Sequence, residues 1–196
     1  LKNILLTKGT DFHWVVNHPE LKKFDLTQGS FWGYALSDDN EQQIIVPGAF
    51  TVKGKQKIDE FMAFLQKALA DENILTDEVK KSFAIWYGKM FFARWRKFIR
   101  DFPDGEMALQ DWPSRHEMAI TMCGEDNPYF NLLKSFAEQT AKVLPDGPRP
   151  DWAKPVLTLA RAQKEALNMD QARKQQPGLK EKLKRKLLKG FSKVKA

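Results

Sequence analysis

The segment from Thr76 to Phe102 carries apolar side chains at spacings of three and four residues, and it constrains the fold more than any other feature. Such steps return a side chain to nearly the same face of an α-helix, so these residues form one stripe. The pattern predicts a long helix with its stripe buried in a core, and base or ligand stacking is the alternative. The stripe consists of Val79, Phe83, Trp86, Tyr87, Met90, Phe91, Trp95, Phe98, Ile99 and Phe102.

The opposite face of this predicted helix is basic, so it can be solvated or can meet an acidic partner. Thr76 is the expected N-cap, and Asp77 and Glu78 follow in the first turn, where carboxylates favour the helix dipole. Pro103 prevents the helix from continuing beyond Phe102. The basic residues are Lys80, Lys81, Lys89, Arg94, Arg96, Lys97 and Arg100.

The rest of the chain predicts a mainly α fold, a helical bundle-like domain with an irregular or mixed N-terminal segment. That segment contains turn signals and two short apolar stretches, residues 3–6 and 43–46, which fit strands or buried extended chain. We divide the chain into an irregular or mixed segment (1–50), a helical core domain (51–145), a Pro-rich connection with a helix (146–178) and a basic amphipathic helix (179–196).

Four further helices are expected, at residues 55–70, 114–122, 128–143 and 156–171. The first of them is joined to the aromatic helix by a short connection, which fits antiparallel neighbours. Ser114 and Glu117 have the spacing of a capping box. Asn127 and Pro128 fit the N-cap and first residue of the next helix.

The apolar faces of these helices define the expected core, and Phe50 should be buried where a Pro47-Gly48 turn leads into the first helix. Burial of a large aromatic at the centre of the stripe makes Trp95 important for stability. The expected core residues are Ile58, Phe61, Leu65, Phe83, Trp86, Tyr87, Phe91, Trp95, Phe98, Leu132, Leu133 and Phe136.

The net charge of +7 is concentrated at the C-terminal end. Residues 171–196 hold ten Lys or Arg and one acid, a charge of +9, which leaves −2 for the rest of the chain. This basic amphipathic helix can dock on a partner surface, lie on an anionic membrane or neutralise nucleic-acid phosphates. Its candidate partner-binding residues are Lys182, Arg185, Lys186 and Lys189.

Motifs for catalysis or cofactor binding are missing from the sequence. Neither a Walker A loop, a G-x-G-x-x-G turn nor a G-x-S-x-G elbow is present. His13, His18 and His116 lack metal-ligand spacing, and the single cysteine, Cys123, excludes an internal disulfide. We therefore expect no enzymatic activity, no cofactor and no metal, although an active site assembled from distant residues stays open.

Three short motifs occur in order over about half of the chain. The first combines a Pro-Gly turn with a threonine and a later glycine, and the second is an aromatic ladder. The third consists of an N-cap, a first-turn proline and the apolar face of the helix that follows. They comprise Val46, Pro47, Gly48, Ala49, Phe50, Thr51 and Gly54; Tyr87, Phe91, Trp95 and Phe98; and Asn127, Pro128, Leu132, Leu133, Phe136 and Thr140.

Together these motifs resemble the TssM (IcmF-type) inner-membrane component of bacterial type VI secretion systems, and the related component of type IVB systems also fits. Phe50 and Phe91 stand where tyrosine is usual in that family, and Lys55 stands where an aromatic is usual. Asn127 replaces a serine. These changes keep the packing role of the rings and remove two hydroxyl groups.

The resemblance implies a structural scaffold domain in the periplasmic, helical part of a larger inner-membrane protein, with the transmembrane helices outside this chain. It implies an inner-membrane partner and an outer-membrane lipoprotein, both contacted by the parent protein, and an oligomeric complex without nucleic acid. The start at Leu1 instead of Met fits a piece of a longer protein. The alternative function is a nucleic-acid or anionic-membrane binding module that uses the basic C-terminal helix.

Overall fold

The computed structural model describes residues 12–34, 44–68 and 77–175 of the 196-residue chain. Within those ranges the fold is mainly α, as predicted, and the strands form one two-stranded sheet. The elements, with η for 3₁₀ helices, are α2 (His13–Val16), η1 (Pro19–Phe24), β1 (Leu26–Thr27), α3 (Gly29–Trp32), β2 (Ile45–Val46), η2 (Gly48–Phe50), α4 (Val52–Ala68), α5 (Asp77–Asp101), η4 (Phe102–Ala108), α6 (Trp112–Met122), α7 (Pro128–Val143) and α8 (Ala153–Gln175).

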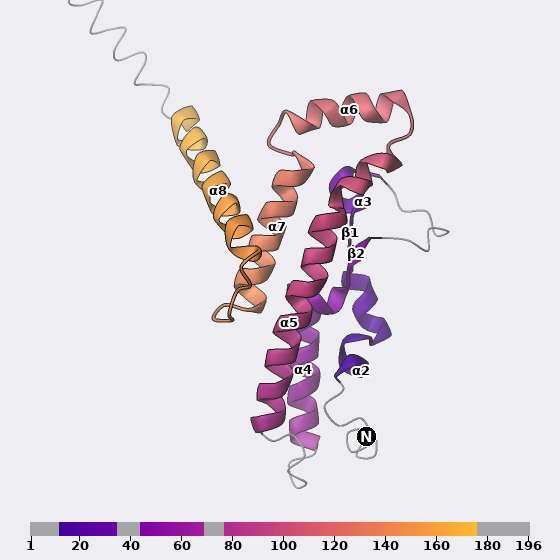
Figure 1. Ribbon diagram of the computed structural model, residues 1–196, viewed down its shortest axis with the longest axis vertical. Coiled ribbons are helices and arrows are strands. Elements are labelled where there is room, and N and C mark those ends of the chain that lie inside the picture. The colour runs from indigo at the N-terminus through magenta and orange to yellow at the C-terminus, as the bar shows by residue number, and fades with distance from the viewer. Residues whose placement is uncertain (1–11, 35–43, 69–76, 176–196) are drawn as a thin grey trace, which may run out of the picture.

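The long helices run alternately in opposite directions along the molecule (Figure 1). Helix α4 descends from η2, α5 rises, α7 descends and α8 rises beside α7. Helix α6 crosses the upper ends of α5 and α7, and the N-terminal elements lie along one side of α5. The expected antiparallel arrangement of α4 and α5 is confirmed.

The aromatic stripe of α5 lies in the core, as predicted. The rings of Tyr87, Phe91, Trp95 and Phe98 are all buried, so they cannot offer a free face to a base or a ligand. Helix α5 ends at Asp101, where Pro103 follows in η4, and its first residues are the acids Asp77 and Glu78. The expected N-cap, Thr76, lies outside the described residues.

Nine of the twelve expected core residues are buried, and three differ. Trp86 and Leu133 are half-buried at the edge of the core. Phe61 was expected inside but is 36% exposed. Its ring borders a small hollow between α4 and the N-terminal elements, where Trp14 lies edge-on at 5.9 Å and no other aromatic ring of the described residues contacts it.

The irregular N-terminal segment contributes to the same buried cluster as the long helices. Phe12, Val15 and Trp32 come from it, and each lies in or beside an element of only four residues. Strand β2 confirms the extended chain expected before Pro47, and it pairs antiparallel with β1. The other expected strand, residues 3–6, lies outside the described residues.

Two helices begin three residues earlier than predicted. Thr51 has extended backbone angles, and its hydroxyl accepts the Gly54 N–H at 3.2 Å, so it caps α4 and the helix begins at Val52. Helix α8 begins at Ala153, before Pro155. Proline is tolerated there because an N–H in the first turn has no intrahelical acceptor.

The predicted capping box at Ser114 is wrong. Asp111 is the N-cap of α6, and its carboxylate accepts the Ser114 N–H at 2.8 Å and the Ser114 hydroxyl at 2.7 Å. Pro113 fits the first turn, so the helix starts before the serine. Between α5 and α6 the chain forms the short helix η4.

Helix α7 begins as predicted, since the Asn127 side chain accepts the Tyr129 N–H at 2.9 Å and Pro128 is the first helical residue. Its inner face packs on α5, while α8 covers it from the other side (Figure 1). None of the described helices is long and apolar enough to span a bilayer.

Candidate functional site

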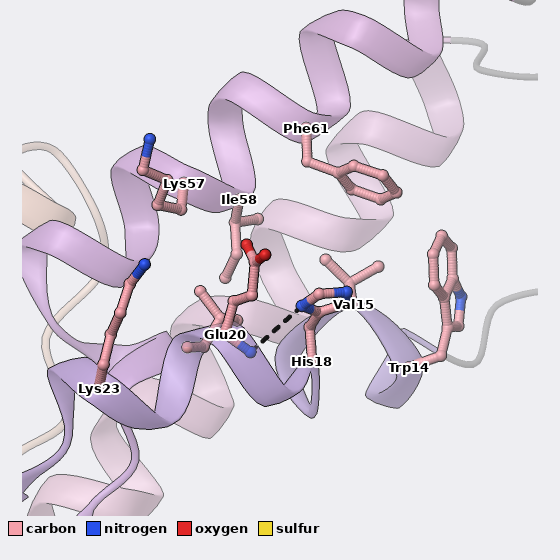
Figure 2. Close-up of a pocket in the computed structure, with 9 residues that line it drawn as sticks. Trp14, Val15, His18, Glu20, Lys23, Lys57, Ile58 and Phe61 are labelled. Atoms are coloured by element: carbon pink, nitrogen blue, oxygen red, sulfur yellow. Dashed lines mark hydrogen bonds between the residues drawn. The ribbon is translucent and has the colours of Figure 1, made fainter.

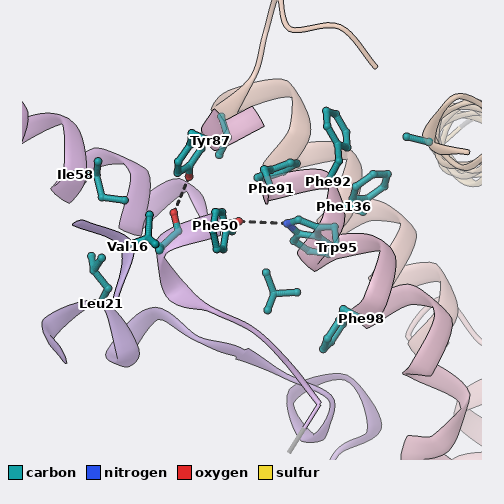
Figure 3. Packing of buried hydrophobic residues seen from close by; sticks show 14 of the residues in the cluster. Val16, Leu21, Phe50, Ile58, Tyr87, Phe91, Phe92, Trp95, Phe98 and Phe136 are labelled. Carbon is teal, nitrogen blue, oxygen red and sulfur yellow. Dashed lines mark hydrogen bonds between the residues drawn. The ribbon is translucent and has the colours of Figure 1, made fainter. Parts of the chain in front are cut away.

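The first two sequence motifs meet at residues 47–51, which we call the turn segment. The Tyr87 hydroxyl donates a hydrogen bond to the Ala49 carbonyl oxygen at 2.6 Å. The Trp95 indole N–H donates to the next carbonyl, that of Phe50, at 3.2 Å. Figure 3 shows both bonds reaching from the ladder to the turn segment. Two aromatic residues of α5 therefore hold two consecutive peptide groups.

The Phe50 ring is buried, as predicted, and lies 5.4 Å from the Tyr87 ring between centroids. Further along the ladder, Phe91 contacts Trp95 and Trp95 contacts Phe98, with ring centroids about 6 Å apart in both pairs. All of these predicted motif residues are packed inside the molecule, and the structure brings them together.

The turn segment is also closed on itself. The Thr51 hydroxyl donates to the Gly48 carbonyl oxygen at 2.7 Å, and the chain then enters α4. A Cβ atom at Gly54 would lie 1.8 Å from that same oxygen, so this position requires glycine. Pro47 is the first residue of the segment, where it is the N-cap of η2, and it is half-buried.

Asp25 holds the turn segment from the N-terminal side. Its carboxylate accepts the Gly48 N–H at 2.5 Å, between residues 23 positions apart. Burial raises the pKa of Asp25, and the Gly48 N–H and the charge of Lys22 oppose that rise. The sequence analysis missed this residue, because a single aspartate before a short strand has no periodic signal.

The third motif joins the second through α7. The rings of Phe136 and Trp95 lie 5.3 Å apart between centroids. The Gln139 side-chain oxygen accepts the Val52 N–H at 2.6 Å, which satisfies a backbone donor in the first turn of α4. Thr140 is fully buried, and its hydroxyl has no hydrogen-bond partner among the described residues. Pro128 is buried at the other end of α7.

The upper end of α5 is capped by the N-terminal segment. The Trp32 indole N–H donates to the Phe102 carbonyl oxygen at 3.2 Å, and the Gln28 amide donates to that of Asp101 at 2.5 Å. Carbonyls at the end of a helix lack intrahelical partners, so these side chains replace water there. Neither residue was singled out from the sequence, since their partners are backbone atoms about 70 residues away.

The ionisable groups near this junction have structural partners. Burial raises the pKa of the Tyr87 phenol, which stays protonated at neutral pH and donates to Ala49. The Lys55 ammonium lies 5.6 Å from the Tyr87 ring centroid and pairs with Asp59. The described part of the chain contains no group of three or more His, Cys, Asp or Glu that could hold a metal ion.

The contacts of His18 and His116 are structural. The Nδ1 atom of His18 accepts the Glu20 N–H at 3.4 Å and caps η1. The His116 ring stacks on Trp112 at 4.9 Å on the surface of α6.

A small hollow lies between η1 and α4, with a volume of about 130 Å³ (Figure 2). Ile58 forms its floor, Trp14 and Phe61 stand at one side, and Lys23 and Lys57 stand at the other. This volume is far below the 300–1,000 Å³ that is typical of small-molecule sites. The hollow is therefore a packing defect at the edge of the core.

The four candidate partner-binding residues of the basic tail, Lys182, Arg185, Lys186 and Lys189, lie outside the described residues. The structure instead brings together the candidate structural residues of the first two motifs. Pro47, Gly48, Phe50, Thr51 and Gly54 form the turn segment and the start of α4, and Tyr87, Phe91, Trp95 and Phe98 of the ladder lie in the same buried cluster as Phe50. The candidate structural residue of the third motif, Pro128, is buried apart from them at the other end of α7. Comparison of the chain with models of protein families, with curated proteins and with solved structures found no match.

Proposed function

We propose that this chain is a scaffold domain of a trans-envelope secretion complex of the TssM/IcmF type and that it acts through protein contacts without catalysis. It works on the periplasmic side of the bacterial inner membrane as part of a larger parent protein. One observation carries this proposal: three segments that resemble motifs of that family, far apart in the sequence, meet around one turn.

The roles of the motif residues also support a scaffold. The polar groups of Tyr87 and Trp95 are directed at backbone carbonyls inside the chain, and none of the ring faces of the ladder is free. A site for chemistry needs reactive groups that converge on an open cleft. A shape-holding junction needs buried, satisfied groups, and this junction has them apart from the Thr140 hydroxyl.

Helix α6 offers a surface for partner contacts. It has no buried residue, and it exposes Trp112, with an exposed fraction of 73%, together with Ile120. Large apolar side chains gathered on one exposed element are typical of protein interaction sites. The helix crosses the top of the molecule, away from the turn segment (Figure 1).

The compartment is tested through the exposed native Cys123 just after α6. Cells that produce the full parent protein are treated with a membrane-impermeant maleimide before and after lysis of the inner membrane. We expect labelling before lysis, and the same protein with Cys123→Ser corrects for cysteines elsewhere in the parent. Labelling that requires lysis would place the domain in the cytoplasm and refute the proposal.

The alternative is a binding module for nucleic acid or anionic membrane, which the +9 charge of residues 171–196 favours. It predicts salt-dependent binding to DNA or to phosphatidylglycerol vesicles by the full chain and loss of that binding in a chain that ends at Gln176. Equal and negligible binding by both chains would dismiss this alternative.

A further inference from the structure

A long groove runs between the basic face of α5 and residues 144–152, the connection that leads into α8. Its α5 side extends from residue 84 to residue 100, a rise of about 24 Å at 1.5 Å per residue. Its lining includes no residue of the turn segment and none of the ladder residues Tyr87, Phe91, Trp95 and Phe98.

The groove has an apolar floor. Phe92 and Trp152 form it, with ring centroids 6.2 Å apart in an edge-to-face arrangement, and Leu144 lies beside them. Trp152 also stacks on Phe136, which fixes its position from inside the molecule. At Gly88 no side chain enters the groove, and a Cβ there would meet only Leu144, at 3.8 Å.

The rim of the groove is basic, and no acidic side chain lines it among the described residues. Lys89 and Arg96 form no ion pair with any described carboxylate. Arg100 is paired with Asp101, and the Arg149 guanidinium donates to a backbone carbonyl. Lys89 and Arg96 therefore remain available for carboxylates from outside.

We propose that this groove binds an acidic amphipathic segment of a partner protein, with apolar side chains on Phe92 and Trp152 and carboxylates at Lys89 and Arg96. A helix of about 16 residues matches the length of the groove. This proposal rests on the proposed function in one respect, namely that a scaffold domain binds partner proteins. It adds the chemistry of one such partner.

The shape and charge of the groove favour a peptide over the other anionic partners. A bilayer surface is flat, whereas this apolar surface is concave and lies between two segments of the chain. Single-stranded nucleic acid would need free ring faces for base stacking, and the Trp152 ring already stacks on Phe136. An acidic amphipathic peptide uses both the floor and the rim.

The probe is a synthetic, N-acetylated, amphipathic peptide of about 16 residues made of Glu and Leu, with Leu at spacings of three and four. Its affinity for the full 196-residue chain is measured by calorimetry. Arg96→Glu removes a rim cation, and Arg94→Glu makes the same change on the same helix at an exposed position that does not line the groove. Gly88→Leu fills the floor, and Gly88→Ala is its matched control.

We expect Arg96→Glu and Gly88→Leu each to weaken binding about tenfold or more, and both controls to stay within about twofold. Equal affinity for all four variants would overturn the proposal, because the basic tail alone would then account for the binding. Absence of binding to the unaltered chain would overturn it as well. Arg96→Glu still decides the matter if Gly88→Leu disturbs folding.

Phosphatidylglycerol vesicles serve as the competing probe. Vesicle binding that is lost in Arg96→Glu and Gly88→Leu but kept in both controls would assign the groove to membrane and overturn the peptide proposal. These measurements use purified protein and do not depend on the compartment. Failure of the groove proposal is therefore distinguishable from failure of the secretion proposal, which the Cys123 labelling tests.

Discussion

Trp95 and Phe50 are joined across 45 residues, because the indole N–H of one donates to the carbonyl oxygen of the other. The same indole packs on Phe136 and is completely buried. We expect Trp95→Ala to lower the free energy of unfolding by about 3–5 kcal/mol, as truncation of a buried aromatic does. Trp95→Phe should lower it by about 1–3 kcal/mol, since the Phe50 carbonyl loses its donor.

Urea unfolding followed by circular dichroism measures both changes. Trp112→Ala is the matched control, because Trp112 is mostly exposed on α6, and we expect a change within about 0.5 kcal/mol. An unchanged unfolding midpoint in Trp95→Ala would contradict the central place of this residue in the core.

Two glycines of the long helices should respond in opposite directions to alanine. Gly54→Ala places a Cβ 1.8 Å from the Gly48 carbonyl oxygen, so the turn segment must move. We expect a loss of about 1–3 kcal/mol or more in the free energy of unfolding. Gly88→Ala meets only Leu144, at 3.8 Å, and should gain about 0.4–1 kcal/mol.

Thermal unfolding of the two variants side by side measures this difference. Both substitutions replace a helical glycine with the best helix former, so propensity alone predicts a gain in each. A gain in Gly54→Ala would mean that the close approach of α4 to the turn segment is not needed.

Asp25 makes stability depend on pH. Burial raises the pKa of Asp25 above its ordinary value of 3.8, so the folded state holds the proton more tightly than the unfolded state. Its contribution to the free energy of unfolding therefore falls as the pH rises from below 3.8 through the folded pKa. Asn at this position cannot ionise, and its amide oxygen can still accept the Gly48 N–H.

We expect Asp25→Asn to gain stability relative to the unaltered chain between about pH 3 and about pH 7. Asp25→Ala removes the acceptor of the Gly48 N–H and should cost about 1–3 kcal/mol at neutral pH. Urea midpoints of the three proteins at both pH values provide the comparison. If the difference in urea midpoint between Asp25→Asn and the unaltered chain did not change with pH, the raised pKa of Asp25 would be contradicted.

A substitution of the N-cap residue tests which residue begins α6. Asp111→Ala removes the acceptor of the Ser114 N–H and should destabilise α6 by about 0.5–2 kcal/mol. Because α6 has no buried residue, the effect should be local: faster amide hydrogen exchange in α6 with a nearly unchanged global midpoint. Glu117→Ala is the control, and equal acceleration there would restore the capping box at Ser114.

The long helices were predictable because each repeats its apolar side chains over several turns. The ladder in α5 and the Asn127 cap of α7 are examples, and both agree with the structure. The N-terminal contribution to the core was not predictable. Trp32 lies in a helix of four residues, which is too short to display a period.

The hydrogen-bond partners of the motif residues were harder to predict from the sequence than the motif residues themselves. Tyr87 and Trp95 were identified as core residues, but their acceptors are backbone carbonyls, which every residue has. The need for Gly54 depends on a contact with Gly48 that only the folded chain creates. The prediction that Phe61 is buried was wrong for a related reason. The spacing of apolar residues shows which face of a helix is apolar, but it does not show how far the neighbouring elements extend over that face.

The bond between Trp32 and Phe102 spans 70 residues and imposes an order on events during synthesis. At about 5–20 residues per second, a ribosome takes roughly 4–14 seconds to make the acceptor after the donor. Both residues pass through the same exit tunnel, so the same interval separates their emergence, and throughout it Trp32, Phe12 and Val15 lack the helix that covers them. The apolar side chains of the N-terminal segment are therefore exposed until α5 has followed them.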